Sequence, residues 1–273
     1  MKLTKIDSVD RYNDIVLQYR RKGCLTNDYL QKEATSLVQE GKLSECCLGD
    51  NAFLFVKKDI GLRVYYYLND IDSIPDFDIN EDLIIELLFR GESNFPKEEV
   101  SYLLKCGFYE HILRDQYSAV YKDIQLISYE VPNLNIYIAK TIDEIEYAVN
   151  LFNKTFDNYT GNYIPSSEYN KLFDDRCVLI ARLEGKLAGA MHFRREGKVI
   201  WAEHNVVEEW CRGNHVGSLL CNAFIETAKN DENTRYTRWT QHGGQAAKMY
   251  EKLGFKYVNK SSFSMLKLRN KSL

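Results

Sequence analysis

The spacing of hydrophobic residues alternates along the chain between a helical and a strand-like period, which predicts a mixed α/β protein. Helical spacing follows residues that commonly begin helices, namely Ser8, Thr26 or Asn27, Pro96 and Thr141. The apolar faces of the first three helices are Val9, Tyr12, Val16 and Tyr19, then Leu30, Ala34, Leu37 and Val38, then Val100, Leu103 and Leu104. Apolar runs at 52–57 and 62–68 predict a hairpin that turns at 59–61, and a further run lies at 83–89.

In the second half, three predicted strands at 177–183, 187–194 and 199–207 are separated by Glu-Gly-Lys turns, so we expect an antiparallel meander. A helix with one apolar face follows, comprising Leu219, Leu220, Ala223, Phe224 and Ala228. The next strand, 234–241, must run parallel to 199–207 because a helix crosses over between them.

A similar unit occurs twice in the chain. Leu-Leu-Lys-Cys-Gly107-Phe108 and Tyr-Glu-Lys-Leu-Gly254-Phe255 lie 147 positions apart, and a predicted strand follows each, at 117–121 and 264–268. We interpret the first half as a degenerate copy of the second, with chance similarity of one short unit as the alternative. The linker Val131-Pro-Asn-Leu-Asn then divides the chain into domains 1–130 and 131–273.

Composition narrows the class of protein. The 273 residues are 45% hydrophobic and 27% charged, with 36 Lys and Arg against 39 Asp and Glu, so no basic footprint for nucleic acid is present. No apolar run approaches the roughly 20 residues that cross a bilayer. Seven scattered cysteines without a Cys-x-x-Cys pair favour reduced thiols and no metal site. We expect a cytoplasmic protein, a monomer or homodimer, with no membrane or nucleic-acid partner.

The segment between strand 199–207 and the following helix has the character of a phosphate-binding loop. Gly213 and Gly217 allow the backbone to turn tightly and to approach a ligand closely. Unpaired amides at the start of the helix would point into this loop, and Arg212 adds a cation at its edge. An ordinary strand-to-helix turn is the alternative.

This loop and a later helix together resemble the GNAT superfamily of acyl-CoA-dependent N-acyltransferases. The family's loop, Arg/Gln-x-x-Gly-x-Gly/Ala, is matched by Arg212-Gly-Asn-His-Val-Gly217, and its Ala-x-x-x-Tyr-x-x-x-Gly-Phe helix by Ala246, Tyr250, Gly254 and Phe255. The resemblance covers Asn135 to Asn270 and, with the repeat, implies tandem GNAT folds, each a central mixed sheet flanked by helices.

The resemblance implies acetyl-CoA as co-substrate and no metal. It assigns coenzyme binding to Val206, Val207, Arg212, Gly213, Asn214, His215, Val216, Gly217 and Ser218, with Val207 pairing with the pantetheine. His215 departs from the family pattern, where a glycine is common; phosphate binding survives provided that residue 215 does not need a positive φ. Gly243 also departs, since an Asn that contacts the coenzyme is common there.

Tyr250 matches the family's general acid, although its helical spacing also fits a core tyrosine. For the base, the two-residue period of a strand places Val207, Glu203 and Trp201 on one side and His204 and Val206 on the other. Family members often carry Glu or His four or six positions before the residue equivalent to Val207. Glu203 fits this rule as the base, directly or through water, whereas Trp201 cannot act as one.

Two further assignments remain open at this point. Glu203 could instead form a salt bridge with Arg194 or Arg238, and His242 is a second candidate base. In GNAT proteins the loop at 157–167 shapes the acceptor pocket, which makes Tyr159 and Tyr163 candidates for substrate contact beside Trp201 and His242. Surface tyrosines are the alternative.

The resemblance therefore predicts an N-acetyltransferase that acts on a primary amine of a small molecule or peptide. Two other classes remain possible: a non-catalytic acyl-CoA sensor, which the match at Tyr250 argues against, and an aminoacyl-tRNA-dependent transferase with two such domains. The pyrophosphate loop and the absence of basic excess argue against the latter. Glu203, His192, Trp201 and the tyrosines suggest a polar or cationic acceptor.

Overall fold

The computed structural model describes residues 2–269, so residue 1 and residues 270–273, which we had assigned to the two domains, lie outside it. The described residues form two compact units, one of residues 2–113 with 261–269 (unit 1) and one of Arg114–Lys260 (unit 2). The chain passes from one unit to the other inside strand β7 (Tyr109–Val120) and again inside strand β13 (Lys256–Lys267). This division differs from the predicted 1–130 and 131–273, because each unit takes a strand segment from the other half of the sequence.

Unit 2 is built on a mixed sheet in the order β8-β9-β10-β11-β12-β7. The strands are β8 (Leu134–Ile138), β9 (Val178–Leu183), β10 (Lys186–Glu196), β11 (Val199–Val207) and β12 (Arg235–Gln241), with β7 beside β12. Neighbours are antiparallel except β11 and β12, which are parallel. The meander and the parallel crossover are therefore confirmed.

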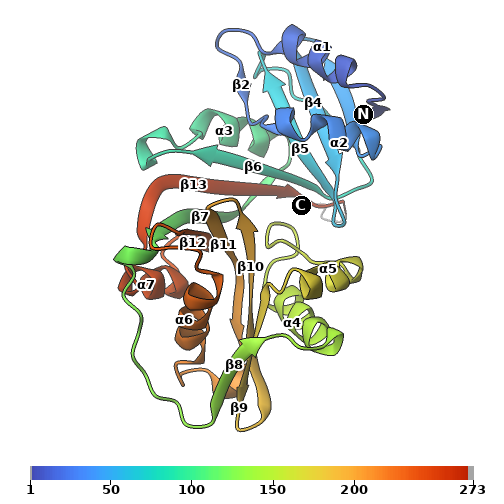
Figure 1. Cartoon of the computed structure of the whole chain (residues 1–273). Helices are drawn as coiled ribbons and strands as arrows, with labels where there is room; N and C mark the ends of the chain where they lie inside the picture. Colours follow the sequence, from blue (N-terminus) through green and yellow to red (C-terminus); the bar gives the residue numbers. More distant parts are fainter. Residues whose placement is uncertain (1, 270–273) are drawn as a thin grey trace. The chain divides into compact units, whose positions relative to one another are not determined.

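Helices cover both faces of this sheet. As Figure 1 shows, α4 (Ile142–Thr155) and α5 (Tyr169–Asp174) lie on one face, while α6 (Val216–Ala228) and α7 (Gln245–Lys252) lie on the other. The Thr141 side chain accepts the Glu144 amide at 3.2 Å and so caps α4 as predicted. Short 3₁₀ turns lie at Tyr121–Asp123, Ser166–Glu168 and Glu209–Cys211.

Unit 1 repeats the strand order of unit 2. Its order is β1-β3-β4-β5-β6-β13, again antiparallel except for one parallel pair, β5 and β6. The strands are β1 (Thr4–Lys5), β3 (Leu43–Leu48), β4 (Asn51–Lys57), β5 (Leu62–Leu68) and β6 (Leu83–Phe89), and β2 (Leu25–Thr26) pairs with β5. Beside β6, β13 occupies the position that β7 occupies beside β12. The predicted repeat is therefore present, although β3 had not been expected.

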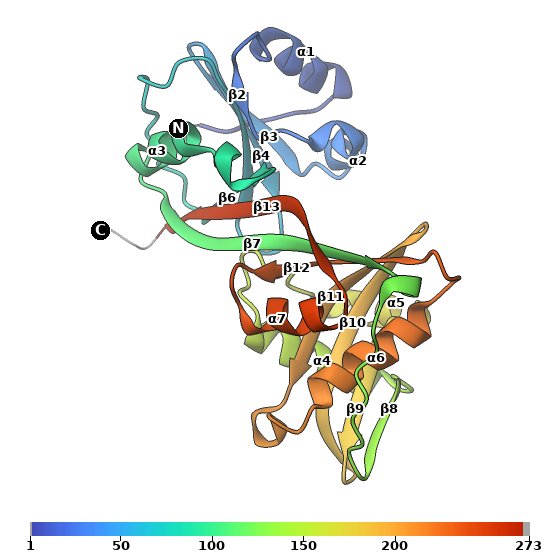
Figure 2. The ribbon, with the colours of Figure 1, turned by 90° about the vertical axis from the view of Figure 1, so that its left-hand side faces the viewer.

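The helices of unit 1 are α1 (Val9–Tyr19), α2 (Ala34–Gln39) and α3 (Lys97–Lys105), with 3₁₀ turns at Leu30–Lys32 and Glu92–Asn94. Ser8 caps α1 as predicted, by accepting the Arg11 amide. The helix expected to begin at Thr26 or Asn27 begins instead at Ala34, and Leu104 is 47% exposed instead of lying in the core. In Figure 2, α1 and α2 lie on one side of this sheet and α3 on the other.

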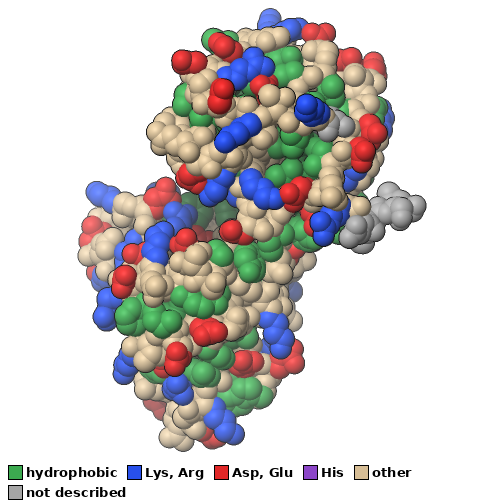
Figure 3. Space-filling model, turned by 90° about the vertical axis from the view of Figure 1, so that its right-hand side faces the viewer, with side chains coloured by type: hydrophobic (Ala, Val, Ile, Leu, Met, Phe, Trp, Pro, Cys, Tyr) green, Lys and Arg blue, Asp and Glu red, His purple; other side chains and the backbone are tan. Residues whose placement is uncertain are grey.

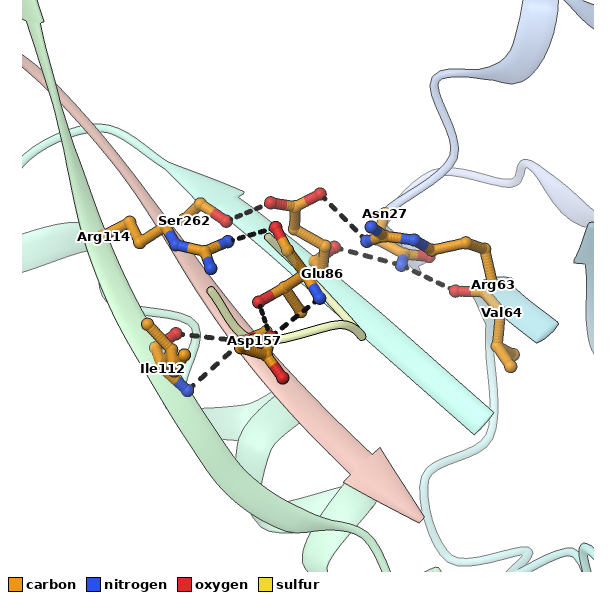
Figure 4. A network of polar contacts seen from close by, with 10 residues as sticks. Asn27, Arg63, Val64, Glu86, Ile112, Arg114, Asp157 and Ser262 are labelled. Carbon is orange, nitrogen blue, oxygen red and sulfur yellow. Dashed lines mark hydrogen bonds and ion pairs between the residues drawn. The ribbon is translucent and has the colours of Figure 1, made fainter. Parts of the chain in front are cut away.

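Asn27 bridges strands β5 and β6 instead of capping a helix. Its side-chain amide donates to the carbonyls of Val64 and Glu86 (Figure 4). Its oxygen accepts the Tyr66 amide. Ser262 Oγ and Arg63 contact the Glu86 carboxylate within the same unit. Asn27 therefore occupies the space in which β5 and β6 separate, since their pairing covers only Leu62–Leu83 and Arg63–Ile84.

The connection between β5 and β6 carries no counterpart of α6. Residues 69–82, all described, form neither helix nor strand. Phe77 from this segment is 3% exposed and packs edge-on against Phe53 and Phe108. A loop with one buried ring therefore takes the place that a helix takes in unit 2.

Acidic and basic side chains are interspersed on the face of each unit seen in Figure 3. Within residues 2–269, no helix combines the length and apolar character needed to cross a bilayer.

Candidate functional site

The loop between β11 and α6 ends in a backbone conformation that leaves several amides free. Gly213 has φ +86°, and His215, the residue before α6, has φ 58° and ψ 6°. Within residues 2–269, the amides of Gly213, His215, Val216, Gly217 and Ser218 have no hydrogen-bond acceptor. Free amides and the positive end of a 13-residue helix together make a site for an anion such as phosphate.

Arg212 lies at the edge of this loop with an exposed side chain. Its Nη1 is 3.6 Å from the Glu209 carboxylate and its Nε donates to the Val207 carbonyl at 3.4 Å. Both contacts are long and solvent-exposed, so the guanidinium can turn toward an anion at small cost. Arg212 therefore adds the positive charge that the sequence predicted for this site.

His215 does adopt the positive φ that the sequence analysis required it to avoid. Histidine is one of the non-glycine residues that enter the left-handed region more readily, so the strain is moderate. Its ring stacks on Tyr129, with centroids 3.6 Å apart and planes inclined by 20°. The stack gives the His215 ring a packing partner, and the loop adopts the left-handed conformation at this position without a glycine.

Strands β11 and β12 separate beyond a short region of pairing. Only Val199, Ile200 and Trp201 pair with β12, opposite Arg235, Tyr236 and Thr237. From there β11 continues along β10 to Val207, and β12 continues along β7 to Gln241. The backbone edges of the two strands face each other without pairing, which leaves a wedge between them that could accept an extended ligand as an extra strand. We call this space the β11–β12 wedge.

A β-bulge at Glu203 changes which side chains face which side of the sheet. His192 pairs with His204 but Phe193 with Ala202, so Glu203 is the extra residue. Beyond the bulge, Asn205 bonds to α6 and Val207 lies against Gly217 of α6, whereas Glu203 contacts Asn162 before α5. The prediction that Glu203 and Val207 share a side is therefore wrong, because simple alternation cannot include a bulge.

Tyr250 on α7 is fully buried and its hydroxyl lies 3.1 Å from the Cys221 sulfur of α6. Asn205 donates to the same sulfur at 3.0 Å and to the Gly217 carbonyl at 3.1 Å. Burial raises the pKa of the Cys221 thiol to about 12, so it stays protonated and unreactive near neutral pH. The phenol is therefore in the core beside the wedge, next to a neutral partner that a bound sulfur could replace.

Glu203 is the salt-bridge partner of Arg194, one of the two alternatives the sequence left open. Arg194 Nε lies 3.2 Å from Oε1, and Asn162 Nδ2 donates to Oε2 at 2.8 Å, while the carboxylate side chain is 14% exposed. Both oxygens have partners, but the Arg194 side chain is half exposed and also reaches Glu196. An incoming cationic amine could displace it from one oxygen.

The other residues predicted to contact the substrate do not lie in one place. Tyr163 lines a pocket of about 410 Å³ that is bordered by Arg194, and the lining also includes Lys171, Arg195, Glu168 and Asp175. Trp201 lies beneath the Arg194 guanidinium, 5.6 Å from it. Tyr159 and His242 do not line this pocket. His242 lies instead beside Asp115, with Nδ1 2.6 Å from the carboxylate, and its side chain is 55% exposed.

Two histidines lie back to back beneath α4. His192 and His204 approach through their Nδ1 atoms at 3.3 Å, and His204 Nε2 lies 2.8 Å from the Gly161 carbonyl. Burial lowers the pKa of His204, and burial with the neighbouring His204 lowers the pKa of His192 to about 3. Both rings are therefore neutral at physiological pH.

Sequence patterns did not predict the cluster at Tyr250, in which Arg238 stacks on the ring, Cys221 contacts the hydroxyl and Asn205 contacts Cys221. One signal was available for Arg238: it alternates on its strand with Tyr236, which is fully buried. The described residues contain no cluster of three or more metal-ligating side chains.

Comparison with known proteins identifies the family of unit 2. Residues 145–255 match the family model for the acetyltransferase (GNAT) family, and no curated protein matches the chain. A GCN5-related N-acetyltransferase from Sphaerobacter thermophilus is 10% identical, with a TM-score of 0.59 over 88% of this chain and 87% of that one. One from Kribbella flavida is 12% identical, with a TM-score of 0.54 over 86% and 92%.

A tandem GNAT protein from the clavulanic acid biosynthesis pathway covers the chain throughout, with 11% identity and a TM-score of 0.57 over 100% of this chain and 99% of that one. At these identities the likeness shows the fold alone. The prediction of two GNAT-like units, each a mixed sheet flanked by helices, is confirmed.

Proposed function

Residues 145–255 of this chain belong to the GNAT acetyltransferase family, and on that premise we propose that the protein transfers an acetyl or other short acyl group from coenzyme A to a primary amine of a small molecule or peptide. The observation that carries this proposal is the run of free amides at the start of α6, placed at the end of the β11–β12 wedge. A diphosphate and an extended amide chain are the two parts of an acyl-CoA that such a loop and wedge would bind.

The coenzyme residues predicted from the sequence fit this arrangement. The amides of Gly213 and His215–Ser218 would bind the diphosphate, with Arg212 beside them and Asn214 within the loop. The backbone of Val206 and Val207, on the free edge of β11, would pair with the pantetheine. The thioester would then lie deeper in the wedge, toward Glu203 and Tyr250.

Tyr250 is proposed as the general acid and Glu203 as the general base. Glu203 would remove a proton from the acceptor ammonium, directly or through a water, after the amine displaces Arg194 from one carboxylate oxygen. The neutral amine then forms a bond to the thioester carbonyl carbon, the carbon–sulfur bond breaks, and the new amide nitrogen loses its extra proton to water, from which the Tyr250 phenolate would recover its proton. Tyr250 would give its phenolic proton to the departing thiolate, exchanging its contact with Cys221 for one with the coenzyme sulfur.

The pocket of about 410 Å³ beside Arg194 is the proposed acceptor site. Tyr163, which lines it, would contact the acceptor, and Glu168 and Asp175 are the carboxylates that an ammonium could contact there, beside the cations Lys171, Arg194 and Arg195. Trp201, packed under Arg194, would hold the Arg194–Glu203 pair in position. Tyr159 and His242 lie outside this pocket, so they have no role in the proposal.

Calorimetric titration with acetyl-CoA tests the proposal. Gly217→Asp should abolish binding, because its Cβ would lie 3.2 Å from a Val207 methyl and its carboxylate would repel the diphosphate. Gly197→Asp is the matched control, since Gly197 lies in the turn between β10 and β11 with φ +59° and open space around it. Wild-type protein that binds no coenzyme would contradict the proposed function, whereas binding by Gly217→Asp would contradict only the loop assignment.

A further inference from the structure

Arg238 of β12 is a buried cation without a hydrogen-bond partner on two of its nitrogens. The residue is 5% exposed, and within residues 2–269 its Nε and Nη1 contact no acceptor. Its guanidinium carbon lies 3.7 Å from the centroid of the Tyr250 ring, a cation–π contact that compensates only part of the lost hydration. An uncompensated buried charge is costly for folding, so a group that binds here should supply the missing acceptors.

The position of Arg238 points toward the transferred group. Thr237 is the last residue of β12 that pairs with β11, so Arg238 stands at the closed end of the β11–β12 wedge. Burial lowers the pKa of Arg238 to about 10, and Cys221 of α6 and Glu203 of β11 act on it in the opposite direction. Arg238 therefore lies among Tyr250, Cys221 and Glu203, the groups that surround the proposed thioester.

An acetyl group offers a single acceptor, the thioester carbonyl oxygen, and its methyl accepts no hydrogen bond, so it has no pair of oxygens for the two unpartnered nitrogens. A carboxylate separated from the thioester carbonyl by one or two methylene groups would accept from the two free donors and form a charge-assisted contact. Sites built to hydrogen-bond one group reject analogues that lack it, since their buried donors are then left unpaired. The same chemistry could come from a carboxylate on the acceptor amine, but Arg238 stacks over the Tyr250 ring and does not line the acceptor pocket.

Resting on the proposed function, we propose that Arg238 binds a carboxylate of the acyl group, so that the preferred donor is the coenzyme A thioester of a short dicarboxylic acid. Malonyl and succinyl groups are the simplest members of this class. Arg238 is then a specificity residue for the donor.

Measuring the binding of the acyl donor in the absence of an acceptor shows whether the carboxylate belongs to the acyl group or to the acceptor amine. Malonyl-CoA is compared with isovaleryl-CoA, in which a neutral isopropyl group replaces the carboxylate at nearly the same shape. Calorimetry on the full chain should show malonyl-CoA binding at least tenfold more tightly. In the Arg238→Met variant, the two donors should bind with equal affinity. The melting temperature of this variant should not fall below that of the wild type, because the substitution replaces an unpaired buried charge with an apolar side chain.

Arg182→Met is the matched control. Each nitrogen of Arg182 has one acceptor, on Tyr137, Glu144 or the Gly185 carbonyl, so its loss should lower stability and leave donor preference unchanged. Arg238→Lys, which keeps the charge, should keep a preference for malonyl-CoA if Arg238→Met does not fold. Equal affinities for the two donors in wild-type protein, or a preference that survives in Arg238→Met, would overturn the inference. Failure of every coenzyme A species to bind would instead overturn the proposed function.

Discussion

Replacing Tyr250 with phenylalanine separates a catalytic tyrosine from a structural one. The substitution keeps the ring, which packs against Phe255 with centroids 5.2 Å apart and lies beneath the Arg238 guanidinium. It removes one hydroxyl, whose contact is the Cys221 sulfur at 3.1 Å. Cys221 retains the Asn205 donor, so unfolding free energy should fall by about 1 kcal/mol or less.

The effect on turnover should be much larger. A general acid contributes roughly 100-fold or more to the rate, which corresponds to about 2.7 kcal/mol of activation free energy. Because the phenol does not contact the phosphate loop, the dissociation constant for acetyl-CoA should stay within about twofold of wild type. The expected result is a low kcat in a folded protein that binds its donor normally.

Tyr236→Phe is the matched control, because Tyr236 is also fully buried and its hydroxyl donates to the Ile225 carbonyl at 2.6 Å. Its loss leaves a buried carbonyl without that donor, so stability should fall by about 1–3 kcal/mol while turnover is unchanged. The assays are thiol release with a panel of amines, calorimetry with acetyl-CoA, and urea unfolding.

A Tyr250→Phe variant within threefold of wild-type turnover would refute the reasoning. The thiolate would then leave without an acid, and Tyr250 would be a core tyrosine. An equal loss of turnover in Tyr236→Phe would show that the assay reports damage to packing. If the wild type binds acetyl-CoA but turns over no amine in the panel, a non-catalytic acyl-CoA sensor becomes the better hypothesis.

Three further predictions concern the loop, the histidine pair and the division of the chain. In calorimetry, His215→Gly should keep the wild-type affinity for acetyl-CoA. His215→Val should lower that affinity about tenfold or more, because a β-branched residue is strained at φ 58°. Equal affinities of the two variants would contradict the backbone conformation assigned to residue 215. The pKa of His192 is lowered to about 3 in the folded protein, so as the pH falls below about 6.5 the unfolded chain binds this proton first. The free energy of unfolding is therefore at its full value above about pH 6.5 and decreases below it. Urea unfolding should show a loss on the order of 1–2 kcal/mol from pH 7 to pH 5 that His192→Asn reduces, and an unchanged pH dependence would count against a buried neutral ring. A fragment of residues 114–260 should fold and bind acetyl-CoA. A fragment of residues 131–273 should do neither, because this second fragment lacks the seven residues of β7 that pair with β12. The reverse result would contradict the division into unit 1 and unit 2.

Local sequence patterns were sufficient to predict much of the secondary structure of unit 2. The meander of β9, β10 and β11 follows from apolar runs separated by Glu-Gly-Lys turns, and α4 follows from its Thr141 cap and apolar face. The exchange of β7 and β13 could not be predicted in this way. Which strand completes which sheet depends on pairing between residues more than 100 positions apart, and no local period records it.

The candidate site likewise has a part that sequence patterns predicted and a part that they did not. The loop at 212–218 is contiguous, so its glycines and its place before a helix were legible in the sequence. The cluster of Asn205, Cys221, Arg238 and Tyr250 comes from β11, α6, β12 and α7, and it forms only when these elements pack. The bulge at Glu203 was invisible for another reason: one inserted residue breaks the two-residue period without changing the composition.

The two units share a strand order but differ at the wedge, which bears on where an acyl donor can bind. In unit 1, β5 and β6 also separate after two paired positions, but the chain itself fills the opening. Leu25 and Thr26 of β2 pair with the free edge of β5. Asn27 bonds to Val64 and Glu86 (Figure 4) and also accepts the Tyr66 amide. A pantetheine would have to displace these bonds, and the 69–82 segment offers it no helix N-terminus for the diphosphate. Among the described residues, the proposed donor site therefore belongs to unit 2, because the corresponding opening in unit 1 is closed by β2 and Asn27.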